Sequence, residues 1–132
     1  MPRLSAWIVR TSLLYLLAGF IFGSLMLAQK GVSYYPPIWA VLPMHMEFLV
    51  VGWLVQFAMG VAFWILPRHG RGRPRGDERL ILAAFIVLNA GVLLAASALV
   101  LPKALLAGRT LEAAAMLLFV LGSWGRVKPH GV

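Results

Sequence analysis

The sequence predicts an all-α membrane protein, a four-helix transmembrane bundle that forms one domain over residues 1–132. Hydrophobic residues make up 61% of the chain and charged residues only 12%, which is more apolar than a typical soluble domain. The apolar residues form four runs of about 20, the length that an α-helix needs to cross a bilayer. A chain of 132 residues has room for one domain, and its lack of cysteine excludes disulfides and thiolate metal sites.

The first expected helix covers residues 7–28, and a linker of different composition follows it. In this linker, "QKGVSYYPPIWAVLP", Pro36 and Pro37 disfavour a continuous helix. Its tyrosines and its tryptophan favour the headgroup layer of a membrane. We therefore expect residues 29–43 to lie along the membrane surface.

The other three apolar runs have clear ends. The second expected helix covers residues 44–66 and ends before Pro67, whose ring disfavours helical geometry at the preceding residue. The third covers residues 80–101 and contains no charged residue. The fourth covers residues 104–124 and follows after two residues, so the third and fourth helices should pack as an antiparallel hairpin.

A few polar residues interrupt these apolar runs. Arg109 and Glu112 lie three residues apart in the fourth helix and should form an ion pair on one face. Asn89 is expected to make hydrogen bonds between helices, and Ser97 to bond back to its own helix. Glu47 lies within a turn of the start of the second helix, and two interpretations stay open: an interfacial carboxylate or a proton-transfer group.

The net charge of +8 comes from basic residues placed beside the apolar runs, a pattern typical of membrane topology signals rather than of nucleic-acid binding. Because basic loops stay on the cytoplasmic side, both termini should be cytoplasmic and His45 should lie on the outer side. We expect a multi-pass protein of the cell membrane, a bacterial inner membrane, with the lipid bilayer and not nucleic acid as its partner. The basic residues on the cytoplasmic side are Arg3, Arg10, Arg68, Arg71, Arg73, Arg75, Arg79, Arg126 and Lys128.

One face of the second helix carries the candidate site. At about 100° per residue, His45, Gly52, Gln56 and Phe63 share one stripe, with Gly60 beside it. Small residues admit a close neighbour and a buried amide needs a partner, so the stripe should face protein or a cofactor and not lipid. A neutral imidazole is a good axial ligand for haem iron, although a hydrogen-bonded or interfacial histidine is the alternative. The candidate cofactor-binding residues are His45, Gly52 and Gln56, with His45 as the metal ligand.

The segment "HMEFLVVGWLVQFAMGVAFWILPR" resembles the second transmembrane helix of subunit I in the haem-copper oxidase superfamily, and is closest to the nitric oxide reductase branch. The family's helix also has a histidine at its outer end, followed by an apolar run, a glycine, an aromatic residue and a closing proline. The first helix, "LLYLLAGFIFGSLMLAQ", is similar in its glycine spacing. The resemblance covers about half of the chain, and it implies that His45 is an axial ligand of a low-spin b-type haem.

This chain also departs from the family. Family catalytic subunits have about twelve helices in three arcs of four, and further histidines that bind a second haem and another metal. This chain has four expected helices and one intramembrane histidine, so we do not expect an isolated chain to be an oxygen- or nitric-oxide-reducing enzyme. Three copies around a threefold axis would reproduce the family's layout, which predicts a homo-oligomer, and specifically a trimer.

Three functional interpretations remain open from the sequence. In the first, the protein binds haem b through His45 and acts in electron transfer or haem handling. In the second, it is a cofactor-free structural or accessory subunit of a respiratory membrane complex, which its small-residue helix faces would contact. In the third, the oligomer forms a small channel or transporter, with Glu47, Gln56 or Asn89 lining a wet pathway.

Overall fold

The computed structural model describes residues 1–67 and 77–127, and every regular element in these ranges is helical. Four helical segments are long and apolar enough to cross a membrane. The predictions of an all-α chain and of four spanning-length helices are therefore confirmed. The four segments are Arg3–Gly31, Pro36–Ile65, Glu78–Leu99 and Ala104–Arg126.

Part of the predicted arginine-rich loop and the tail, 68–76 and 128–132, lie outside the described residues. His69 and His130 belong to these two segments.

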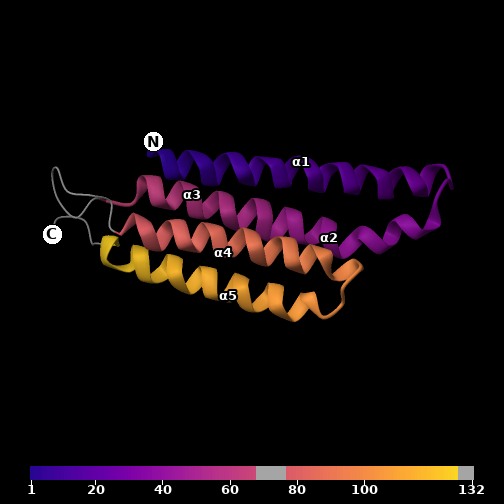
Figure 1. Cartoon of the computed structure of the whole chain (residues 1–132). Helices are drawn as coiled ribbons and strands as arrows, with labels where there is room; N and C mark the ends of the chain where they lie inside the picture. The colour runs from indigo at the N-terminus through magenta and orange to yellow at the C-terminus, as the bar shows by residue number, and fades with distance from the viewer. Residues whose placement is uncertain (68–76, 128–132) are drawn as a thin grey trace.

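The four segments lie side by side in the order of the chain (Figure 1). The first segment is α1 (Arg3–Gly31), which packs along the second, and the third in turn packs against α5 (Ala104–Ser123). The third segment consists of α4 (Glu78–Ala96) and a short 3-10 turn, and it forms the predicted antiparallel hairpin with α5. The start of α1 and the end of α5 lie at the same end of the molecule (Figure 1).

The second segment begins earlier than the sequence predicts. A 3-10 helix, Pro36–Val41, leads directly into α2 (Leu42–Glu47), so the prolines of the linker start the helical segment and do not interrupt it. Proline is tolerated in a first helical turn because the N–H that it lacks would have no intrahelical partner there. The helical segment therefore includes residues 36–43, which the sequence assigns to a linker.

A π-helix, Phe48–Val55, separates α2 from α3 (Gln56–Ile65). The prediction assumed a regular α-helix here, and a hydropathy pattern does not distinguish the two. π-Helical turns are rare and occur frequently at functional sites. This π-helix begins at the residue after Glu47, so the two titratable residues of α2, His45 and Glu47, lie directly before the irregular backbone.

Small residues let α1 approach the second segment closely. A Cβ atom on Gly52 would lie 2.6 Å from Cγ of Tyr15, and one on Gly60 would lie 3.0 Å from Cγ2 of Ile8. The Ser5 hydroxyl donates a hydrogen bond to the carbonyl oxygen of Gly60. The predicted stripe therefore faces protein along much of its length, and that protein is α1.

Glycines also set the contact between α4 and α5. A Cβ atom on Gly108 would lie 2.6 Å from the backbone nitrogen of Ala95 and 2.8 Å from the carbonyl oxygen of Gly91. Because these neighbours are backbone atoms, no side-chain rotation makes room for a larger residue. Gly108 therefore allows the two helices to touch backbone to backbone, the kind of contact that small residues provide between membrane helices.

Arg126, which follows α5, contacts the end of α3. Its guanidinium is buried and donates hydrogen bonds to the carbonyl oxygens of Phe63 at 2.8 Å, Leu66 at 2.7 Å and Pro67 at 3.1 Å. The last carbonyls of a helix have no partner within the helix, so a buried arginine satisfies them here. The sequence predicts Arg126 only as a topology signal, whereas in the structure it caps a helix.

Candidate functional site

His45 lies on α2 and faces α1. Its Nδ1 atom lies 2.7 Å from the carbonyl oxygen of Gly19. A carbonyl oxygen only accepts, so Nδ1 carries the hydrogen, and in the neutral imidazole Nε2 keeps its lone pair. The ring fits into a notch that Gly23 leaves in α1, because a Cβ atom there would lie 2.7 Å from Cε1 of His45. Two glycines of the first helix thus fix both the orientation and the tautomer of the histidine.

A pocket of about 280 Å³ lies beside the His45 ring, between α1 and the second segment. Most of its lining is apolar, and two of its lining side chains, Phe20 and Leu27, are exposed on the outside of the molecule. A haem is larger than this pocket, so a macrocycle bound to His45 would project from this face of the chain. The lining residues are Phe20, Gly23, Ser24, Leu27, His45 and Leu49.

Gln56 is fully buried in a hydrogen-bond network that joins three helices. Its amide donates to the carbonyl oxygen of Ile8 at 3.3 Å, and its Oε1 accepts from Nδ2 of Asn89 at 2.9 Å. The hydroxyl of Tyr15 donates to Oδ1 of Asn89, also at 2.9 Å. Asn89 therefore makes the interhelical bonds that the sequence predicts.

The other two predicted site residues do not share the pocket of His45. Gly52 packs against the Tyr15 ring and Gln56 is engaged in the network, and neither lines the pocket beside the histidine. Cofactor binding by Gly52 and Gln56 stays a prediction. In the structure they hold α1 against the helix that carries His45.

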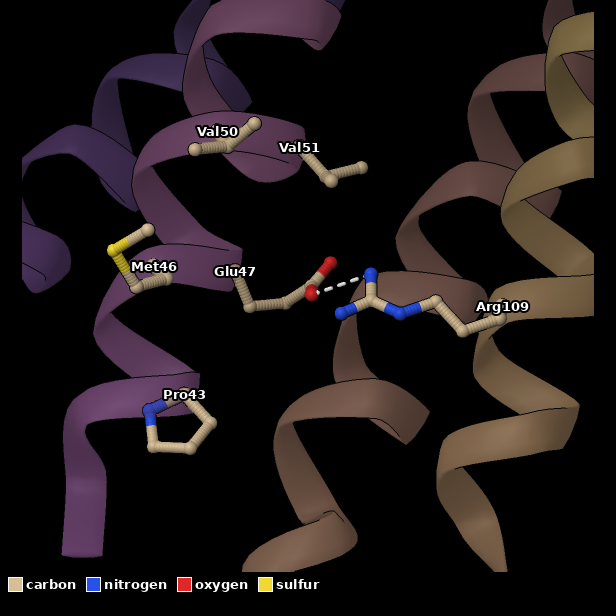
Figure 2. Close-up of a pocket in the computed structure, with 6 residues that line it drawn as sticks. All are labelled: Pro43, Met46, Glu47, Val50, Val51 and Arg109. Atoms are coloured by element: carbon tan, nitrogen blue, oxygen red, sulfur yellow. Dashed lines mark ion pairs between the residues drawn. The ribbon is translucent and has the colours of Figure 1, made fainter.

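A second polar site lies between α2 and α5 (Figure 2). Nη1 of Arg109 lies 2.6 Å from Oε2 of Glu47 and 2.8 Å from Oε2 of Glu112. The pair of Arg109 with Glu112 is confirmed, and Glu47 joins it from another helix with only 4% of its surface exposed. Glu47 is thus a buried, paired carboxylate rather than a solvated interfacial one.

The sequence contains a signal for this site that the prediction did not use. A charged group within an apolar run requires a partner, and Glu47 has none of opposite charge within a turn of its own helix. The nearest basic residues within the expected spans were Arg10 and Arg109. The predicted topology places Arg10 toward the cytoplasmic side and Arg109 toward the outer side with Glu47, so it already favours Arg109 as the partner.

A pocket of about 280 Å³ opens beside Glu47 and Arg109. One oxygen of each carboxylate, Oε1 of Glu47 and Oε1 of Glu112, is buried and has no hydrogen-bond partner. The residues that line the pocket are Pro43, Met46, Glu47, Val50, Val51 and Arg109 (Figure 2).

Within the described residues, no three His, Cys, Asp or Glu side chains come together in a group that could hold a metal ion. Among these residues His45 therefore belongs to no such group. Comparisons with protein-family models, with curated proteins and with solved structures find no match.

Proposed function

We propose that this protein binds a low-spin b-type haem through Nε2 of His45 and acts in electron transfer or haem handling in the membrane. The observation that supports the proposal is the hydrogen bond from Nδ1 of His45 to Gly19, which leaves Nε2 as the nitrogen with a lone pair. A backbone carbonyl is one of the usual partners of the second ring nitrogen in a metal-binding histidine, beside a carboxylate or water. When bound, the haem would supply reversible one-electron exchange.

The surroundings of His45 fit a flat apolar group. The pocket beside the ring has an apolar lining, and Gly23 leaves α1 without a side chain at the point where the imidazole lies. Ser24 adds one hydroxyl to the lining. A bound macrocycle would lie partly outside a single chain, so lipid or another chain would cover its exposed side.

The chain that covers the haem is, in this proposal, a second copy in a homo-oligomer, and a trimer is the favoured form. Among the described residues the principal contacts join consecutive spans, so the outer faces of the row are left for neighbouring copies or lipid. Low-spin haem needs a second axial ligand, and the two other histidines of the sequence lie in its basic segments. A neighbouring copy would therefore supply the other side of the site.

The proposed location is the cell membrane, specifically a bacterial inner membrane, with both termini cytoplasmic. The start of α1 and the end of α5 lie at one end of the molecule, which fits an even number of spans (Figure 1). α2 lies toward the opposite end, so His45 would lie in the outer half of the membrane. In this arrangement the site exchanges electrons or haem near the outer surface.

A second candidate function is a cofactor-free accessory subunit of a respiratory membrane complex. The same hydrogen bond supports it, because His45 bound to Gly19 already joins α1 to α2 without any cofactor. In that case the histidine stabilises the fold, and replacing it would lower stability without changing any visible spectrum. A single measurement, the visible spectrum, therefore distinguishes the two candidate functions.

Protein purified from cells supplied with haem should show a sharp reduced α-band in the visible spectrum. We expect His45→Ala to lose this band, because the proposal assigns the axial ligand to Nε2 of His45. His69→Ala is the matched control and should keep the band. A well-folded wild-type protein without Soret absorbance would exclude the haem proposal and favour the accessory subunit.

The oligomer is tested separately by its mass. Light scattering or native mass spectrometry of the detergent-solubilised protein should give the mass of three chains, each of 132 residues. A mass that corresponds to one chain at all detergent concentrations would contradict the proposed trimer.

A further inference from the structure

The second polar site contains one positive and two negative groups. Arg109 approaches both carboxylates with the same nitrogen, at 2.6 Å for Glu47 and 2.8 Å for Glu112. Because Oε2 of Glu47 and Oε2 of Glu112 both lie within 3 Å of this nitrogen, the two carboxylates are close neighbours. The site therefore holds two carboxylates side by side and a single cation.

The free oxygens of this site require a partner. Oε1 of Glu47 and Oε1 of Glu112 are both buried and make no hydrogen bond. The Glu47 side chain is 3% exposed and lines the pocket that opens beside it (Figure 2). A buried carboxylate oxygen without a donor is costly, and the described neighbours provide no further cation for it.

A single proton resolves both the charge and the missing hydrogen bond. With both carboxylates ionised the site would carry one net negative charge inside an apolar span, which is unfavourable. Two adjacent carboxyl groups that cannot both ionise hold one proton between them. The O–H group of the protonated carboxyl then donates to an oxygen of the other, and the site becomes neutral.

We propose that Glu47, Arg109 and Glu112 form a site that binds one exchangeable proton, and that the pocket lined by Met46 and Val50 is the route by which it exchanges. The proton passes from a hydronium ion to a carboxylate oxygen, where an O–H bond forms and a water molecule is released. Pro43, in the stretch expected at the membrane surface, also lines the pocket, so the pocket leads from that surface past Met46 and Val50 to Glu47. The proposal does not rest on haem binding.

The groups that face this site from neighbouring elements are few. On α2 the other titratable residue is His45, whose ring turns toward α1. α1 contributes Tyr15, whose hydroxyl donates its hydrogen to Oδ1 of Asn89. α4 has no titratable residue after Arg79 in its first turn, so the charge balance is set by the two carboxylates and Arg109.

Infrared spectroscopy of the full chain in lipid nanodiscs tests the proposal. At neutral pH exposed carboxyl groups are ionised, so a carboxylic-acid C=O band reports a buried acid. We expect one such band, equivalent to one acid per chain, and a shift of that band in D₂O. Glu47→Gln and Glu112→Gln should each abolish it, because the remaining carboxylate then pairs with Arg109. Glu78→Gln, at an exposed position, should leave it unchanged.

The route is tested by the rate at which the band shifts after mixing with D₂O. Val50→Phe narrows the pocket and should slow the shift several-fold. Val120→Phe is the matched control, because Val120 has the same 46% exposure as Val50 but lies away from this pocket. The absence of an acid band in the wild type would overturn the proposal. So would a band that persists in a helical, monodisperse Glu47→Gln or Glu112→Gln protein, or one that does not shift in D₂O.

Discussion

Replacing Gly108 with leucine is expected to prevent α4 and α5 from packing. The first added carbon would lie 2.6 Å from the backbone nitrogen of Ala95 and 2.8 Å from the carbonyl oxygen of Gly91, so the two helices must separate. Overpacking a core costs typically about 1–3 kcal/mol, and a clash with backbone belongs at or above the upper end of that range. Equilibrium unfolding in mixed micelles, followed by circular dichroism, measures the loss.

Gly31→Leu is the control for this substitution. A Cβ atom at Gly31 would have no neighbour within 4 Å, so its replacement should change the free energy of unfolding by less than about 0.5 kcal/mol. Equal free energies of unfolding for the Gly108 and Gly31 variants would contradict the close contact between α4 and α5. A clear difference would show that the contact depends on the absence of a side chain at one position.

Replacing Arg126 with leucine is expected to have an effect of similar size. The side chain is 1% exposed and donates to three carbonyl oxygens at the end of α3, and its guanidinium also lies 5.0 Å from the centre of the Phe63 ring. A hydrogen bond from a charged group contributes about 1.5–3 kcal/mol, and a leucine leaves all three carbonyls without this donor. We expect the free energy of unfolding to fall by about 3 kcal/mol or more.

The matched control is Arg10→Leu, because Arg10 is an exposed arginine on α1. It should change stability little, since exposed substitutions usually stay within about 0.5 kcal/mol. Limited proteolysis gives an independent readout: the Arg126 variant should be cleaved faster near Pro67 than the wild type. Unchanged stability and unchanged cleavage would mean that the hydrogen bonds of Arg126 do not stabilise the end of α3.

Hydropathy was sufficient to predict the helices and their hairpin. Apolar runs of spanning length are a property of the sequence alone, so the four segments and the antiparallel contact of α4 with α5 could be read directly. Local spacing was also sufficient to predict the ion pair of Arg109 with Glu112. It likewise predicted that Ser97 bonds to its own helix, and the Ser97 hydroxyl donates a hydrogen bond to the carbonyl oxygen of Leu94 at 2.7 Å. Each of these interactions lies within one helix or one hairpin.

Interactions between distant segments could not be predicted in the same way. The predicted topology places Glu47 and Arg109 on one side of the membrane, but their contact also requires the two helices to be neighbours, which a single sequence does not show. The same holds for the contact of Arg126 with α3. The π-helix at Phe48–Val55 depends on backbone hydrogen bonds that leave no mark on hydropathy. For His45 the sequence indicated a face that meets protein or cofactor, and the structure adds the hydrogen bond that fixes its tautomer.

Chemical rescue with imidazole is the sharpest test of the proposal that Nε2 of His45 is an axial ligand of haem. In His45→Gly the ligand is removed and space for a free imidazole is left in its place. We expect the haem-loaded variant to lack the sharp reduced α-band and added imidazole to restore it, whereas His69→Gly should need no imidazole. A His45→Gly protein that keeps the wild-type band without imidazole would rule out His45 as the ligand, because the iron would then be held by another residue.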